Sequence, residues 1–156
     1  MVREMMIREF LQRLTVGDDE ARLLTMEESG LPVDMLVTTL YGFGSVSNIG
    51  QGEFYFYGEE EPEAFACRIT VVPEVLAENV LPLCVELATV NYDLPIGSFS
   101  FDRTENCVVY TLQVPFAEGL SDEEIIEEAD LCIRLAIDFS ARYASQYAFY
   151  ANRREL

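Results

Sequence analysis

The chain has 156 residues, half of them apolar, and a formal net charge of −18. This length and composition predict one globular domain with a core of its own and exclude a disordered chain. Such an acidic surface repels nucleic-acid phosphates and anionic membranes, and it attracts basic partners. The same charge could also serve solubility alone.

Missing residue types exclude several kinds of active site. The sequence contains no histidine, and its 10 basic residues are all arginines. Histidine-dependent triads and His-ligated zinc are therefore excluded, as are lysine Schiff bases and phosphate-loop lysines. The acidic runs 59–61 and 122–124 lack the spacing of a calcium loop and indicate a solvated turn and a helix start. We predict no catalytic residue, no cofactor and no metal site.

The cysteines and the first residues indicate a cytoplasmic protein. Cys67, Cys84, Cys107 and Cys132 each lie in an apolar run and form no C-x-x-C pair, which is typical of buried free thiols in a reducing compartment. Charged residues interrupt the apolar start, unlike a signal peptide, and no apolar run approaches the roughly 18 residues of a membrane span.

The first predicted element is an amphipathic helix over residues 3–14, whose apolar positions include Phe10 and Leu11. It packs on its own domain or offers a face to a partner or a second copy. Residues 15–34 give no firm prediction, because 21–27 is compatible with either a short helix or an edge strand.

Three strand patterns follow, at residues 35–41, 53–57 and 65–72. Their short connections favour an antiparallel meander. In the second strand, Tyr55 and Tyr57 share the face opposite the phenylalanines. The glycine-rich segment 42–52 has no lysine and no helix after it, so we predict a mobile hairpin linker and not a phosphate-binding loop.

A helix is predicted within residues 74–92, with Pro73 suited to its first turn. Pro82 interrupts this pattern. Either the helix is kinked there, or it begins near Asn79 with Pro82 in its first turn, which costs less because the first amides have no helical partner. Asn91 is predicted to cap the helix end.

The chain then turns at Pro95 and Gly97, where glycine permits a tight approach or a positive φ. Alternating residues at 98–101 and 107–114 predict a hairpin whose loop is 102–106.

The last helix is predicted to begin at a capping box formed by Ser121 and Glu124. If helical to Asn152, it is roughly 45 Å long at 1.5 Å per residue, longer than the sheet requires. Its inward stripe is Ile125, Ala129, Cys132, Ile133, Ala136, Ile137, Ser140 and Ala144. Its aromatic tail after Phe139 suggests contact with another chain, and folding back onto its own domain remains the alternative.

The pattern N-x-x-L-P-x-G-x-F, formed by Asn91, Leu94, Pro95, Gly97 and Phe99, resembles the YbjN-like family, which shares the type III secretion chaperone fold. The likeness covers about residues 65–150, and the earlier part matches by element order alone. It implies a single α+β domain over 1–156, with a five-stranded antiparallel sheet covered by helices in the order α-βββ-α-ββ-α. Arg68 has no counterpart in the resemblance.

The resemblance also implies a binding or regulatory protein and not an enzyme, since secretion chaperones of this fold are dimers that wrap an extended effector segment. We therefore predict a non-enzymatic protein- or peptide-binding module, chaperone-like or regulatory and homodimeric, whose partner could be basic. The alternative is a regulator that senses a small ligand in a pocket between sheet and helices. The predicted partner-binding residues are Tyr55, Tyr57, Phe139, Tyr143, Tyr147 and Tyr150.

Overall fold

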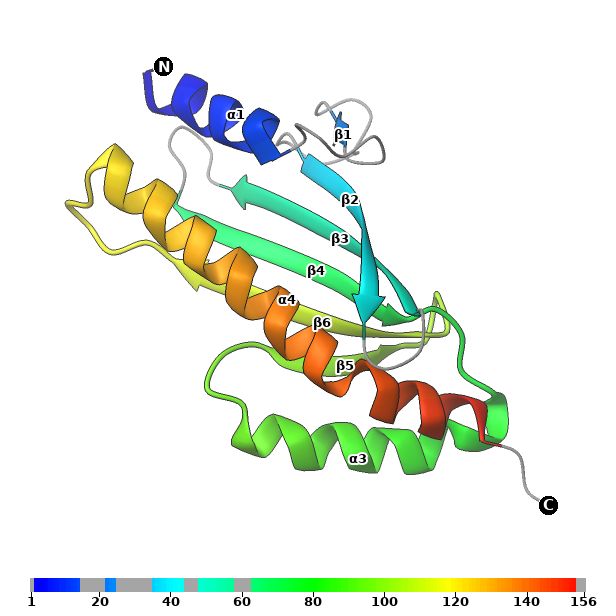
Figure 1. Ribbon diagram of the computed structural model, residues 1–156. Coiled ribbons are helices and arrows are strands. Elements are labelled where there is room, and N and C mark those ends of the chain that lie inside the picture. The colour runs from blue at the N-terminus through cyan, green and yellow to red at the C-terminus, as the bar shows by residue number, and fades with distance from the viewer. Residues whose placement is uncertain (1, 15–21, 25–34, 44–47, 58–62, 154–156) are drawn as a thin grey trace.

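The computed structural model describes residues 2–14, 22–24, 35–43, 48–57 and 63–153 (Figure 1). One antiparallel sheet is covered by helices on one face, and its strand order is β1-β2-β3-β4-β6-β5. The helices are α1 (Val2–Leu14), α3 (Val80–Asp93), preceded by the 3-10 turn η1 (Ala77–Asn79), and α4 (Asp122–Asn152). The strands are β1 (Arg22–Leu24), β2 (Met35–Phe43), β3 (Asn48–Tyr57), β4 (Ala64–Val72), β5 (Ser98–Asp102) and β6 (Cys107–Pro115).

The five predicted strands and their antiparallel pairing are confirmed. A sixth strand, the three-residue β1, pairs with β2 at the sheet edge, so the edge-strand alternative is confirmed for Arg22–Leu24. The predicted linker is wrong for Gly42 and Phe43, which end β2. It is also wrong for Asn48–Gly52, because these residues form the first half of β3 and pair with β2. Residues 44–47 lie outside the described part of the chain.

Helix α3 begins at Val80, so Pro82 lies in its first turn and the second of the two alternatives is confirmed. The prediction for Pro73 is wrong, because this proline follows β4 and opens no helix. The segment after it stays extended because its backbone bonds elsewhere: Val75 N–H donates to the carbonyl of Asn106, and Leu76 N–H donates to that of Ala151.

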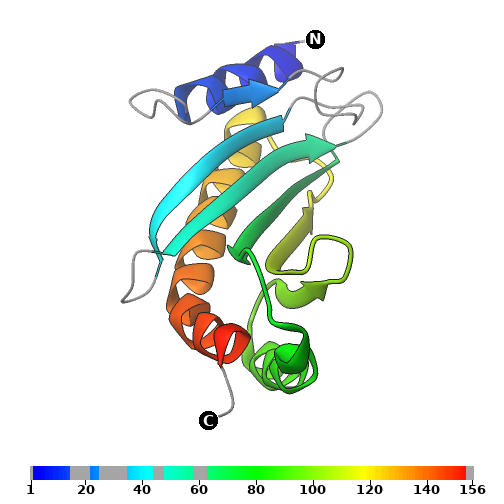
Figure 2. The same cartoon turned by 90° about the vertical axis from the view of Figure 1, so that its right-hand side faces the viewer.

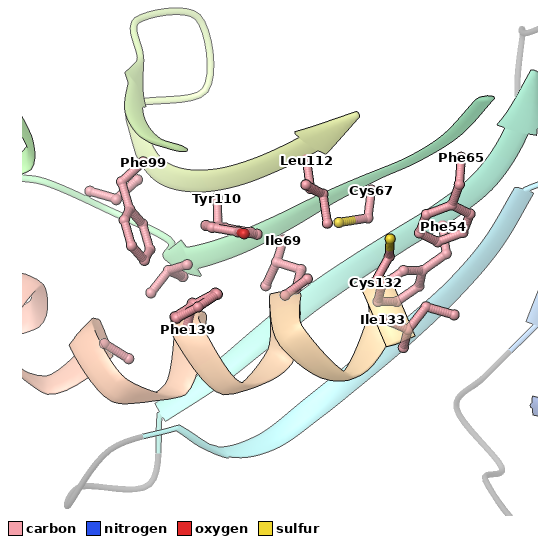
Figure 3. Packing of buried hydrophobic residues seen from close by; sticks show 14 of the residues in the cluster. Phe54, Phe65, Cys67, Ile69, Phe99, Tyr110, Leu112, Cys132, Ile133 and Phe139 are labelled. Atoms are coloured by element: carbon pink, nitrogen blue, oxygen red, sulfur yellow. The ribbon is translucent and has the colours of Figure 1, made fainter. Parts of the chain in front are cut away.

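The core lies between the sheet and α4, which crosses it diagonally (Figures 1 and 3). The predicted capping box at Ser121 and Glu124 is present. The predicted stripe faces the core, with Ile137 only partly buried. Phe10 and Leu11 of α1 are also buried, and the ring centroid of Phe10 lies 6.4 Å from that of Phe56. Helix α1 therefore packs on its own domain.

Three asparagine side chains fix α3 and the segment before it against the rest of the fold. Asn79 donates to the carbonyls of Ala151 and Arg153 at the end of α4, and Asn106 donates to the carbonyl of Val75.

The third of these asparagines, Asn91, does not cap α3. Its side-chain amide donates to the carbonyl of Phe99 and accepts from the N–H of Phe99, both at 2.7 Å. The side chain thus pairs with edge strand β5 as a neighbouring strand would, which fixes α3 against the sheet.

Two buried tyrosines provide a test of the core. The hydroxyl of Tyr110 donates to the carbonyl of Ile96 at 2.8 Å, whereas the buried hydroxyl of Tyr147 has no partner among the described residues. An unpaired buried polar group costs about 1–3 kcal/mol. We expect Tyr147→Phe to leave the free energy of unfolding unchanged or to raise it, and Tyr110→Phe to lower it by about 1 kcal/mol. Urea unfolding measures both variants. A greater loss of unfolding free energy for Tyr147→Phe than for Tyr110→Phe would contradict the conclusion that the Tyr147 hydroxyl is unpaired.

Candidate functional site: an apolar helix face and an open sheet face

One side of α3 exposes apolar side chains to solvent. Leu81, Val85 and Tyr92 are 77%, 63% and 91% exposed, and the exposed Ala88 lies between the last two. Steps of four, three and four residues place all four on one face of the helix. The opposite side of α3 packs inward through Leu83 and Leu87. A helix that is apolar on two sides indicates two contacts, one of them outside this chain.

This helix was predicted from the sequence, but its exposed apolar stripe was not identified. The sequence did contain a signal for the stripe, because the α3 segment has more apolar residues than one buried helix face requires. The helix contains only two ionised residues, Glu86 and Asp93, in a chain whose net charge is −18. Glu86 also links α3 to α4 by accepting from Gln146 at 2.6 Å.

The second surface is the face of the sheet turned away from α4. Figure 2 shows α4 behind the sheet and, within the described residues, no helix in front of it. We call this surface the open face. Strand register places Glu53 beside Arg68 and Arg68 beside Thr111 on it, and Asp102 lies at the end of edge strand β5 on the same face.

A depression of about 620 Å³ lies on the open face, mostly polar in its lining. Its lining residues are Gln51, Glu53, Arg68, Thr70, Pro73, Asp102, Thr104, Glu105 and Cys107. Arg68 lies 2.7 Å from a carboxylate oxygen of Asp102 and 4.0 Å from one of Glu53. The lining therefore contains three carboxylates, those of Glu53, Asp102 and Glu105, and one guanidinium, so the depression is net negative.

The carboxylate of Asp102 is held in its ionised form. The backbone N–H groups of Glu105 and Thr104 donate to one of its oxygens. These bonds, together with Arg68, keep the pKa of Asp102 below its usual value, although partial desolvation acts in the opposite direction. The sequence did not reveal this arrangement, because Asp102 and Arg68 are 34 residues apart.

Three of the four cysteines are poorly suited to nucleophilic chemistry. Burial raises the pKa of Cys67 to about 12, and the nearby Cys132 adds to the effect. Burial also raises the pKa values of Cys107 and Cys132. These three thiols stay protonated at neutral pH, whereas a catalytic cysteine requires a thiolate. Within the described residues, no group of three or more cysteine and acidic side chains is arranged to hold a metal ion.

The predicted partner-binding residues separate into two groups. Phe139 and Tyr147 are buried in the core, and Tyr143 is partly buried beside them. The Phe99 ring centroid lies 5.8 Å from that of Tyr143 and 4.9 Å from that of Tyr147. This part of the tail therefore folds back on its own domain, as the alternative expected. Phe139 and Tyr147 are covered by their own chain, and a role for them in partner binding stays a prediction.

The remaining candidates are more accessible. Tyr150 is half-buried near the end of α4, next to the 65% exposed Phe149. Tyr55 is half-buried on the open face. Tyr57 is the last residue of β3, and the structure describes its backbone only. Their role in binding stays a prediction. Within the described residues, no helix combines the length and apolar composition that crossing a bilayer requires.

Comparisons with known proteins agree with this architecture. Residues 43–142 match the YbjN family model, described as "Putative bacterial sensory transduction regulator". Among solved structures, the chain is similar to one in "Crystal Structure of the ExsC-ExsE Complex", with a TM-score of 0.52 and 17% identity over 91% of this chain and 90% of that chain. It is also similar to YbjN from E. coli, titled "a putative transcription regulator", with a TM-score of 0.43 and 14% identity over 90% of each chain. No curated protein matches the sequence.

The ExsC–ExsE likeness shows a shared fold, so the secretion-chaperone-like α+β architecture predicted from the sequence is confirmed. The family match spans both strands of the β5–β6 hairpin, the whole of α3 and most of α4. It includes the Asn91 and Gly97 positions that join α3 to β5. The family model matches more than half of this chain. The chain therefore belongs to the YbjN family.

Proposed function

We propose that the protein is a non-enzymatic protein-binding module, regulatory or chaperone-like, that works as a homodimer joined through α3. The observation that carries this proposal is the exposed stripe of Leu81, Val85 and Tyr92. Apolar surface of this kind lowers the free energy when it is removed from water, by about 25 cal/mol per Å². A contact between proteins is the ordinary means of covering it.

A second copy of the chain fits the stripe for an electrostatic reason. Two molecules that each carry a charge of −18 repel one another. A stable contact between them must therefore use a region with little charge, and the face formed by Leu81, Val85, Ala88 and Tyr92 has none. Placing two copies of α3 across a two-fold axis covers the same residues on both molecules.

Two further observations support a protein partner over chemistry on a small molecule. The ExsC–ExsE structure, which has a similar fold, is a complex of two named proteins. The raised pKa values of Cys67, Cys107 and Cys132 also weigh against thiol catalysis. Four free thiols suit a reducing compartment, and we propose the cytoplasm.

The small-ligand alternative needs a pocket between sheet and helices. In that layer, aromatic rings pack against one another, with the Phe99 centroid 5.2 Å from Tyr110 and 4.9 Å from Tyr147. The depression at Arg68 lies on the other side of the sheet and is open and polar, whereas small-molecule sites are usually enclosed and mostly apolar. This contrast favours a macromolecular partner.

The mass of the particle in solution tests the dimer. One chain has a mass of 17.7 kDa, so light scattering at micromolar concentration is expected to give about twice that value if the particle is a dimer. A mass equal to one chain across the accessible concentration range would contradict the proposal.

A further inference from the structure

The open face contains a charged arrangement that the dimer contact does not use. Arg68 lies near the centre of the sheet on β4, and the acidic residues around it come from β3, β5 and the hairpin loop. Helix α3 lies beside the outer edge of β5, and its exposed stripe is separate from the depression. A homodimer through α3 therefore does not occupy the depression.

The charge of the depression defines which group it can accept. Glu53, Asp102 and Glu105 supply three carboxylates, and Arg68 supplies the single positive charge. Asp102 stays ionised because its backbone and arginine partners lower its pKa. Glu53 is only 4.0 Å from Arg68, at the outer limit of an ion pair. Carboxylates thus remain in excess, and a further guanidinium or ammonium group would be attracted to them.

The shape of the surface indicates an extended segment and not a compact ligand. The depression is open to solvent and lies across β3, β4, β6 and β5. Tyr55 lies on the same face, two residues along β3 from Glu53, and its partner in β4 is the small Ala66. An aromatic ring near carboxylates is a favourable neighbour for arginine, which packs its planar group against ring faces.

We propose that the depression around Arg68 binds an arginine or lysine side chain of a basic, extended segment of a protein partner. This inference rests on the proposed protein-binding function and adds to it the position and the chemistry of the contact. Arg68 itself occupies part of the site, so the incoming cation shares the carboxylates with it. Nucleic acid is disfavoured at the same surface because phosphates would meet three carboxylates.

The test uses a fluorescein-labelled peptide of alternating serine and arginine, measured by fluorescence anisotropy at 150 mM salt with the full chain. The double variant Glu53→Gln/Glu105→Gln is expected to weaken binding at least 10-fold. The matched control Glu118→Gln/Glu127→Gln removes the same charge at exposed positions elsewhere and is expected to change binding less than 2-fold. Arg68→Gln removes the competing cation and is expected to tighten binding several-fold.

Equal weakening by the two double variants would show that the peptide responds to overall charge, and this result would overturn the site. Equal binding of a peptide with glutamine in place of arginine would overturn it as well, as would failure of the wild-type chain to bind the arginine peptide. Light scattering on Glu53→Gln/Glu105→Gln separates this inference from the dimer proposal, because the mass should remain that of the wild type.

Discussion

Replacing Gly97 by alanine is expected to lower the free energy of unfolding by about 3 kcal/mol. Gly97 has φ +73°, a region that costs an alanine about 1–2 kcal/mol. An added Cβ would lie 2.9 Å from the carbonyl oxygen of Thr111 and still closer to the hydroxyl of Tyr110. The Tyr110 ring would have to move, which would break its hydrogen bond to Ile96 and disturb its packing on Phe99.

Gly119 offers the matched control for this substitution. Its φ is +81°, but no atom lies within 4 Å of the position that an added Cβ would take. Gly119→Ala should therefore lose only the conformational part, about 1–2 kcal/mol. Urea unfolding followed by circular dichroism measures both variants. Losses of equal size would show that the close approach of Gly97 to Tyr110 has no energetic weight.

Val85→Glu is expected to have the largest effect on association. If α3 pairs with its two-fold copy, the substitution buries two like charges and removes two apolar side chains from the contact. We expect the dimer to dissociate at least 100-fold more readily, so that light scattering gives the mass of one chain at micromolar concentration. The unfolding free energy of the single chain should change little, because Val85 is 63% exposed.

Leu131→Glu is the matched control for the α3 stripe. Leu131 is also a large apolar residue, 57% exposed, but it lies on α4. The same change of charge and volume at this position should leave the mass of the particle unchanged. Dissociation by Leu131→Glu and not by Val85→Glu would move the interface from α3 to α4.

The sequence predicted the elements whose signals are local. The capping box at Ser121 and the stripe that follows it lie within one helix, and α4 forms as expected. The start of α3 was also predictable, because the cost of a proline inside a helix favours a first-turn position for Pro82. The five main strands followed from alternation and short connections.

The failures have a common cause, which is contact between distant segments. Asn91 was predicted to cap its own helix, but eight residues later Phe99 offers both an N–H and a carbonyl at the open edge of β5. The aromatic tail of α4 was left with two alternatives, because its folding back depends on β5 placing Phe99 against Tyr147. The Arg68 site depends on β6 lying between β4 and β5, an order that no local pattern encodes.

The most direct test of the proposed dimer is an isotope-filtered NMR experiment on a sample in which half of the chains carry 13C and half do not. Such a spectrum contains only contacts between different molecules. The proposed interface predicts intermolecular signals from the methyl groups of Leu81 and Val85 to protons of α3 in the other chain, including the ring of Tyr92. A spectrum in which these methyl groups show no intermolecular signal, or in which such signals arise from a surface other than α3, would contradict it.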